Sequence, residues 1–349
     1  DDILLSFESS LFYFRVGVFS CFIWYLIDQD KSILTYIYYT LILCFLVLVI
    51  DGYFQYFSGA NIFGLKISNV RTSSFFGDEL IMGSYLARLF PLLFALFLVK
   101  QKQKFENYFI GILFILVDVL IYMSGERSAF FLLNLSTIFI IILIKDYQKF
   151  RLATFLIAVI CIIFLSINSN LNDRMFKDTA KDMGFIDETN SKLTFSKLTF
   201  SKLTFFTPIH DSLYKTAYNM FKDQPILGHG PKIFRIKCKD KKYATGISPC
   251  STHPHHFYIQ LLAETGIIGF SFLFSILTYV LYNALRQLRS IIFKKKRPLT
   301  DYQVCLLAGI LITVSPFNPN GNFFNNWLMI VYCLPVGFYL QSIYSKKNK

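Results

Sequence analysis

The sequence predicts an all-α polytopic membrane protein with about nine transmembrane helices and one large helical loop outside the membrane. Of its 349 residues, 54% are hydrophobic and 18% aromatic, whereas only 16% are charged. Soluble domains carry about 25% charged residues, so this composition excludes a soluble enzyme, a disordered chain and a collagen-like fibre. The apolar residues form long runs and do not alternate with polar ones, which favours helices over a transmembrane β-barrel.

Nine apolar runs are separated by polar connections, and each run predicts one membrane span. Several of the runs are short for a hydrocarbon core of about 30 Å, so their helices should begin within the adjoining loops. The expected spans lie near 11–28, 33–50, 81–99, 108–123, 128–144, 152–167, 257–284, 302–316 and 327–344.

The positive charges predict which side of the membrane each connection faces. The net charge is +13, but the basic residues form short clusters between the apolar runs, which indicates membrane topology and not nucleic-acid binding. The opposite short connections carry only Lys66, Arg71 and Arg127. Because cytoplasmic loops are rich in Lys and Arg, we expect the basic side and the C-terminus to be cytoplasmic. Nine spans would leave the N-terminus outside without a signal peptide, so we also expect upstream helices to be missing from this sequence.

The expected topology divides the chain into three segments. N-terminal transmembrane helices occupy 1–167 and include an outer loop at 51–80, a large outer loop occupies 168–256, and C-terminal transmembrane helices occupy 257–349. The large loop is too long for a simple connector, and it contains all five histidines. The helical spacing of its apolar residues predicts a helix at 211–223.

The large loop also contains the pentapeptide SKLTF three times in tandem, at 191–205. This period is much shorter than the roughly 20 to 50 residues of a solenoid repeat. We interpret the repeat as a duplicated insertion in a tolerant loop, with a β-like or membrane-skimming segment as the alternative.

Arginines near the expected spans are candidate anion-binding groups. Arg127 lies in SGERSAFF at the outer face, where its guanidinium could clamp a diphosphate through bidentate hydrogen bonds. The alternative is an ion pair with Glu126 or contact with lipid headgroups. Arg88 lies within an expected span, where an ionisable residue indicates function. Arg15 and Asp118 also lie within spans, and the sequence suggests no partner for Asp118.

Three histidines stand directly before the span expected at 257–284. Neutral imidazole can accept a proton near pH 7, so His253, His255 and His256 are candidates for a general base at the membrane surface. A purely structural role is the alternative for each of them.

Cys238 and Cys250 are the two cysteines of the large loop, whereas the other five of the seven lie in or beside the spans. In an oxidising compartment they could form a disulfide that closes a short Lys-rich loop before the histidines. The rival interpretation is a metal site with His229 as a further ligand. The spacings match no zinc signature, so we expect no metal.

A histidine–glycine motif and three further strings stand out between residues 51 and 270. His255 and His256 precede nine residues and then Gly266-Ile267-Ile268-Gly269, and the strings FGDEL, SGERSAFF and DQPILGHGPKIF come before them in the chain. Together they resemble the O-antigen ligase and polymerase superfamily of bacterial inner membranes, whose ligase signature is His, then Asn, Ser or Gln, nine residues and Gly-x-x-Gly. His256 departs from that signature but keeps a hydrogen-bonding side chain.

The resemblance implies a metal-independent glycosyltransferase that needs no cofactor. Its donor would be a glycan on undecaprenyl diphosphate, and in the ligase the acceptor is the lipid A–core. The family's loop histidine is proposed to activate the acceptor hydroxyl, and we assign that role to His255. The residues expected to bind substrate are Arg127 and Arg71, which would hold the diphosphate, with Arg88, His253 and His256. The resemblance also implies the bacterial inner membrane, with the large loop in the periplasm.

Three alternatives stay open beside a ligase. A polymerase of the same superfamily would join lipid-linked repeat units, and the Arg-x10-Gly spacing common in polymerases fits Arg235 and Gly246, but the ligase-type histidine signature is the longer match. A protein-O-glycosylating relative is the second. The third, a polysaccharide or lipid transporter, belongs to a different class; it would suit the charges within spans, but the sequence shows no repeated halves.

Overall fold

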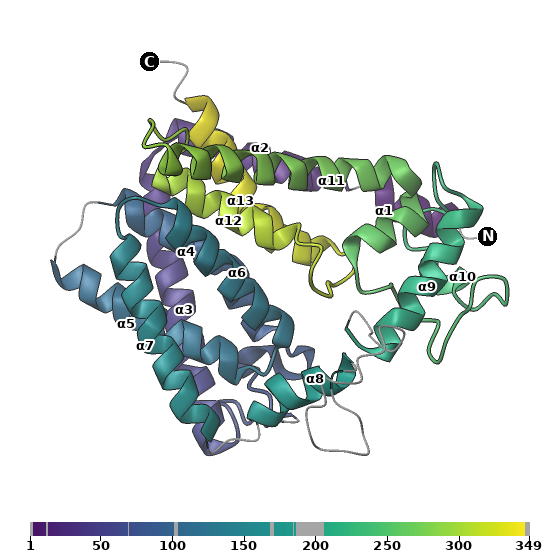
Figure 1. Ribbon diagram of the computed structural model, residues 1–349, viewed down its shortest axis with the longest axis horizontal. Helices are drawn as coiled ribbons and strands as arrows, with labels where there is room; N and C mark the ends of the chain where they lie inside the picture. The colour runs from purple at the N-terminus through teal and green to yellow at the C-terminus, as the bar shows by residue number, and fades with distance from the viewer. Residues whose placement is uncertain are drawn as a thin grey trace. The chain divides into compact units, whose positions relative to one another are not determined.

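The structure is a computed structural model that describes residues 3–11, 13–68, 70–100, 104–167, 171–183, 185 and 206–345. The SKLTF copies at 191–205 lie outside these residues. The regular elements of the described part are all helical, which confirms the predicted all-α class (Figure 1). They are α1 (Ile3–Leu11), α2 (Phe14–Gln29), α3 (Ser32–Ser58), η1 (Ser74–Glu79), α4 (Met82–Val99), α5 (Lys104–Met123), α6 (Arg127–Leu143), α7 (Gln148–Ile167), η2 (Asp173–Lys177), α8 (Asp178–Asp182), α9 (Pro208–Asp223), α10 (Phe234–Lys237), α11 (Phe257–Ile292), α12 (Asp301–Thr313) and α13 (Asn326–Tyr344).

The protein is a multi-pass membrane protein. Within the described residues, six stretches of helix are long and apolar enough to cross a membrane: Ile3–Gln29, Ser32–Ser58, Met82–Val99, Phe105–Met123, Gln148–Ile167 and Phe257–Ile292. Shorter apolar helices occupy Arg127–Leu143, Asp301–Thr313 and Leu328–Tyr344. Each expected span overlaps one of these helices. The count of nine spans and their orientation stay predictions.

The described chain forms two compact units. Unit 1 consists of Asp1–Val18, Asp173–Tyr279 and Val314–Ile330, and unit 2 consists of Phe19–Asn172, Val280–Thr313 and Val331–Lys349. Both units combine parts of the chain that are far apart in sequence. The division by membrane side into 1–167, 168–256 and 257–349 is of another kind and stays a prediction.

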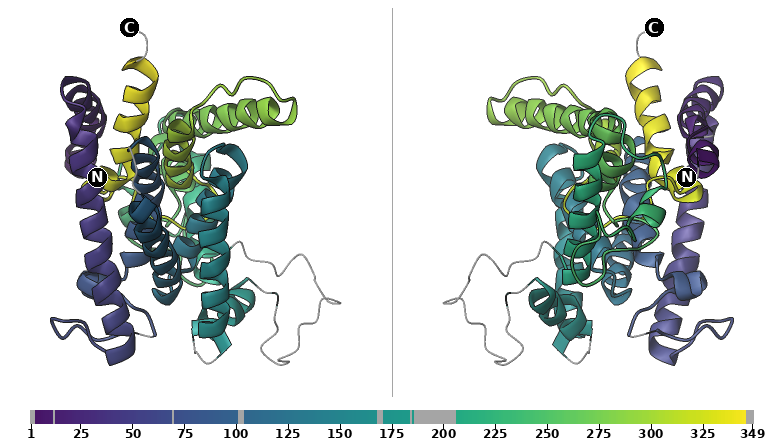
Figure 2. Two further views of the ribbon diagram at one scale, coloured as in Figure 1. Left: turned by 90° about the vertical axis from the view of Figure 1, so that its left-hand side faces the viewer. Right: turned by 90° about the vertical axis from the view of Figure 1, so that its right-hand side faces the viewer.

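Unit 2 is a packed bundle of apolar helices. In it α4 packs against α6 and α12, and α5 packs against α3 and α7 (Figures 1 and 2). Phenylalanines fill its core: Phe90, Phe94 and Phe114 are fully buried, and the ring centroids of Phe90 and Phe114 lie 4.8 Å apart. Tilted and edge-to-face aromatic pairs of this kind stabilise a core beyond the area that they bury.

A buried ion pair joins α5, α6 and α7 within unit 2. Nη1 and Nη2 of Arg151 donate to the two carboxylate oxygens of Asp118 at 2.7 and 3.2 Å. Nη2 also donates to Oγ1 of Thr137 at 2.6 Å, and the side chains of Arg151 and Asp118 are 0% and 2% exposed. The sequence suggested no partner for Asp118, because Arg151 lies 33 residues away, just before the span expected at 152–167.

Helix α9 confirms the helix predicted at 211–223, and it begins three residues earlier, at Pro208. Proline suits the first helical position because it has no N–H to satisfy there. Thr207 is the N-cap, and its Oγ1 accepts a hydrogen bond from the backbone N–H of His210 at 3.3 Å. His210 therefore lies in the first turn of α9.

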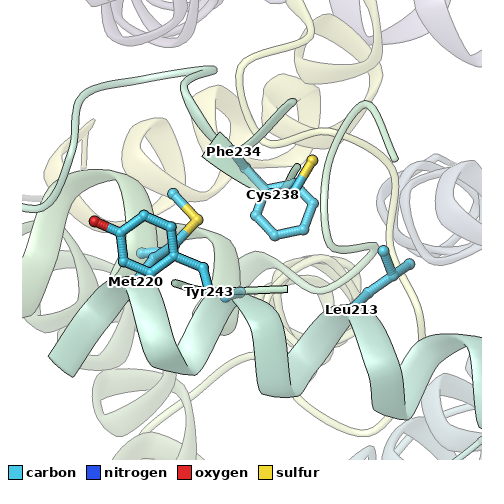
Figure 3. Packing of buried hydrophobic residues seen from close by; sticks show 7 residues of the cluster. Leu213, Met220, Phe234, Cys238 and Tyr243 are labelled. Carbon is cyan, nitrogen blue, oxygen red and sulfur yellow. The ribbon is translucent and has the colours of Figure 1, made fainter. Parts of the chain in front are cut away.

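The apolar face of α9 packs into a buried hydrophobic cluster of unit 1 (Figure 3). The buried residues of this cluster are Leu213, Ala217 and Met220 of α9 with Phe234, Cys238, Tyr243 and Ala263. A disulfide joins Cys238 to Cys250, whose Cα atoms lie 5.0 Å apart. The cluster thus holds the chain that leads into the three histidines against α9.

Candidate active site

Four histidines meet in unit 1, and we call His210, His253, His255 and His256 the histidine cluster. The ring centroid of His255 lies 4.0 Å from that of His253 and 5.8 Å from that of His210, and the ring of His256 lies 5.4 Å from that of Tyr214. The three candidates His253, His255 and His256 stand just before α11, whereas His210 and Tyr214 come from α9. These two were not predicted, because His210 lies just before the helix expected at 211–223; α9 begins at Pro208, so the i, i+4 spacing places both on one face of it.

Hydrogen bonds distinguish His255 from His256. Nε2 of His256 lies 3.0 Å from the carbonyl oxygen of Pro316, which can only accept, so this nitrogen carries a proton and donates it. Nδ1 of the same ring accepts a hydrogen bond from the backbone N–H of Ile259 at 3.4 Å, and His256 is 7% exposed. His255 is half-buried, and its Nε2 lies 3.4 Å from the hydroxyl of Ser251. His255 is therefore the better placed of the two to take a proton from a bound hydroxyl.

The loop after α12 supports the backbone of His255. The N–H of Asn320 donates to the carbonyl of His255 at 2.9 Å, and the hydroxyl of Tyr258 donates to the carbonyl of Val314 at 2.6 Å. His255 has φ of 57°, a left-handed conformation that is uncommon for a residue with a side chain and is often found at functional sites. Sequence analysis missed this loop, although NPNGN at 318–322 is a polar string between apolar runs.

Burial keeps the histidine cluster uncharged at pH 7. It lowers the pKa of His253 from 6.5 to about 3 and that of His210 to about 4, and a positive charge on His255 would lower both further. Burial also lowers the pKa of His255 and of His256. The imidazoles are therefore neutral near pH 7 and able to accept a proton.

We expect the folded protein to lose stability as the pH falls below 6.5. The unfolded chain protonates its histidines near pH 6.5, whereas His253 and His210 resist protonation down to about pH 3 and 4, so acid favours unfolding within that window. Each of the two histidines should lower the free energy of unfolding by about 2 kcal/mol between about pH 7 and 4.5, measured by thermal unfolding in detergent micelles. The double variant His210→Gln/His253→Gln should show a smaller decrease, and an equal decrease would contradict this cause.

The turn between α5 and α6 in unit 2 is organised by Glu126. Its carboxylate accepts hydrogen bonds from the backbone N–H of Gly83 at 2.7 Å, from that of Ser84 at 3.1 Å and from the hydroxyl of Ser84 at 2.7 Å. These groups belong to the first turn of α4, whose N–H groups have no partner within the helix. Burial raises the pKa of Glu126, while the hydrogen bonds from Ser84 and the charge of Arg71 oppose this shift.

Arg71 and Arg127 interact electrostatically in unit 2. Burial lowers the pKa of Arg71; the negative charge of Glu126 opposes this, and the positive charge of Arg127 adds to it. Nη2 of Arg71 donates to the carbonyl of Leu80 at 2.8 Å, but its buried Nε has no hydrogen-bond partner among the described residues. Two neighbouring guanidiniums with a donor to spare are well suited to bind a phosphate group.

Arg88 has structural partners instead. It is 4% exposed, its Nη1 donates to the carbonyl of Ile312 at 3.2 Å, and its guanidinium carbon lies 4.0 Å from the ring centroid of Tyr332. These contacts connect α4 to α12 and α13. A role of Arg88 in substrate binding stays a prediction.

The described residues contain no group of three or more His, Cys, Asp or Glu that could hold a metal ion. Cys238 and Cys250, considered as ligands from the sequence, form the disulfide. Nε2 of His229 lies 3.0 Å from the carbonyl oxygen of Met220.

Comparison with known protein families gives a match to part of the chain. Residues 110–274 match the family model described as O-antigen ligase. The matched segment includes Arg127, α9 and all members of the histidine cluster. No curated protein and no solved structure matches the chain. The segment 110–274 is therefore similar to the O-antigen ligase family, which supports the resemblance that the sequence motifs indicate.

Proposed function

We propose that the protein transfers a glycan from undecaprenyl diphosphate to an acceptor hydroxyl at the outer face of the bacterial inner membrane, with lipid A–core as the acceptor. The observation that carries the proposal is the histidine cluster, which lies within the segment that matches the family. In it His255 is half-buried, and burial lowers its pKa, so its ring is neutral and accessible at pH 7.

The proposed step is a direct substitution at the donor sugar. The acceptor oxygen attacks the anomeric carbon, the bond from that carbon to the diphosphate oxygen breaks, and undecaprenyl diphosphate leaves with the bonding electrons. The hydroxyl proton passes to the ring of His255. A sugar hydroxyl is a poor nucleophile near pH 7, and a positioned base contributes about 10²- to 10⁴-fold to such reactions. Atoms and charges balance without a metal or a cofactor.

Arg127 and Arg71 would stabilise the leaving group. Negative charge grows on the diphosphate as the glycosidic bond breaks, and fixed cations directed at that charge lower the barrier. The interaction between the two guanidiniums in unit 2 supports this assignment, because a bound diphosphate would relieve their repulsion.

Replacing either arginine should weaken the use of the donor. We expect Arg127→Ala and Arg71→Ala each to lower kcat/KM for the lipid-linked donor by about 10- to 100-fold, because a hydrogen bond between charged groups is lost. Initial rates at varied donor concentration in nanodiscs measure this effect. The matched control is Arg286→Ala, which removes an exposed arginine at the far end of α11. If Arg127→Ala and Arg71→Ala had the same kcat/KM for the donor as Arg286→Ala, the assignment would be contradicted.

Orientation is the second part of the proposal. We place the segment 168–256 in the periplasm and the C-terminus in the cytoplasm, supported by the basic connections on the opposite side of the expected spans. This orientation puts the histidine cluster where lipid-linked glycans and lipid A–core meet.

One assay tests the function. The purified protein in nanodiscs is given undecaprenyl-diphosphate-linked glycan with lipid A–core, and the products are separated by gel electrophoresis and mass spectrometry. Glycan attached to lipid A–core supports the ligase. Elongated lipid-linked glycan with donor alone, and no transfer to lipid A–core, would instead assign a polymerase. Movement of unchanged lipid-linked glycan across liposomes, without new bonds, would assign a transporter and overturn the proposal.

A further inference from the structure

Helix α11 consists of two parts of different character, which meet at Gly266. This residue has φ of 62° and ψ of −161°, so the helix is interrupted there. Before it, Gln260 and Glu264 are fully buried, and Glu264 accepts hydrogen bonds from Nε2 of Gln260 at 2.9 Å and from the backbone N–H of Phe234 at 3.0 Å. This first part thus belongs to the polar interior of unit 1.

The part after Gly266 has the features of a membrane span. Large apolar side chains such as Ile268 and Phe272 are exposed on it, 58% and 66% respectively. From Ile267 to Leu285 the helix has a length of about 28 Å, which matches a hydrocarbon core of about 30 Å. Arg286 follows at the next position. A membrane boundary at Gly266 would fit this length and these exposed side chains.

A turn of the large loop is fixed against this boundary. The backbone N–H of Ile267 donates to the carbonyl of Pro225 at 2.9 Å. A Cβ atom on Gly266 would collide with the carbonyl of Ile226, and one on Gly228 would collide with the backbone of Glu264. Two glycines with positive φ thus allow the backbone of the turn to touch that of α11.

The turn presents two large aliphatic side chains away from the protein. Ile226 and Leu227 are 64% and 72% exposed, beside the exposed Ile267 and Ile268 of α11. A contiguous apolar patch of this kind marks an interaction surface. The patch lies next to exposed apolar residues of a helix that is long and apolar enough to cross a membrane, which favours the acyl chains of the bilayer as its occupant.

We propose that α11 enters the outer leaflet at Gly266 and that Ile226 and Leu227 insert into the acyl chains beside it, as an anchor of the large loop. The inference rests on the proposed orientation and on α11 crossing a membrane, and it holds whichever glycan the protein transfers. His256 lies ten residues before Gly266, a distance of about 15 Å along the first part of α11. The anchor would set the height of the histidine cluster above the membrane.

Depth-dependent fluorescence quenching tests the anchor. In the full chain with Trp24→Phe and Trp327→Phe, a single tryptophan is placed by Leu227→Trp, and the protein is reconstituted in liposomes of brominated phosphatidylcholine. The matched control is Ile247→Trp: Ile247 is 77% exposed and follows Gly246, which packs on Ser212 near the other end of α9.

We expect lipids brominated near the headgroup end of the chain to quench roughly half of the tryptophan emission of the Leu227→Trp protein and little of the control emission, because interfacial anchors reach about 5–10 Å into the membrane. Iodide in the aqueous phase should quench the emission of the Ile247→Trp control strongly and that of the Leu227→Trp protein little. Equal quenching of both positions, or quenching of the Leu227→Trp protein by iodide alone, would overturn the proposal.

Discussion

Replacing His255 by alanine is expected to lower glycan transfer by about 10²- to 10⁴-fold while the protein stays folded. The imidazole of His255 is the most accessible ring of the three before α11, and its Nε2 lies next to the hydroxyl of Ser251 at 3.4 Å. Removing it leaves no positioned base for the acceptor hydroxyl. Single-turnover transfer with saturating donor measures the loss in the chemical step.

The matched control is His256, whose Nε2 is already committed to the carbonyl of Pro316 at 3.0 Å. His256→Asn keeps a side-chain N–H donor and should retain transfer. In the wild type, the acid limb of the pH profile should lie below pH 6.5, since burial lowers the pKa of His255 and protonation of the base abolishes its function. Full activity of His255→Ala would reject the assignment of the base.

Breaking the buried ion pair of unit 2 should cost the protein about 3–5 kcal/mol of unfolding free energy. In Asp118→Ala the guanidinium of Arg151 would stay buried without its counter-charge, since Arg151 is 0% exposed and both carboxylate oxygens accept from it. Thermal unfolding in detergent micelles, supported by the yield of monodisperse protein, measures the loss.

The double variant Asp118→Leu/Arg151→Met provides the decisive comparison. It removes both charges and keeps apolar volume, so it should be more stable than Asp118→Ala and approach the wild type. Lys149→Ala removes an exposed cation from α7, the helix of Arg151, and should change the free energy of unfolding little. If the double variant were as unstable as the single variant, the cost would come from packing and not from the unpaired charge.

The local features of this protein could be read from its sequence. The all-α class follows from the length of the apolar runs, and α9 follows from the spacing of apolar residues around Leu213 and Met220. The motif with His255, His256 and the two glycines was likewise visible in consecutive residues. Each of these features depends only on neighbours in the chain.

The pairings between distant residues could not be read in this way. Asp118 needs Arg151, which is 33 residues away, and several other cations lie at similar distances. His210 joins the histidine cluster because α9 packs beside the turn before α11, and Asn320 supports the carbonyl of His255 from a loop beyond α12. Hydrophobic periodicity specifies which face of a helix is buried but not which helix covers it.

The sequence by itself determined a helical membrane protein that resembles the O-antigen ligases, because a membrane demands long apolar helices and the histidine–glycine motif lies within one short stretch of the chain. The tertiary structure alone decided which ionisable groups share an environment. It distinguished His255 from His256, whose Nε2 donates to a backbone carbonyl. It also placed Arg71 near Arg127 and showed that Arg151 is the partner of Asp118. The physical reason is that desolvation and Coulomb interactions depend on distance in space, and packing sets these distances.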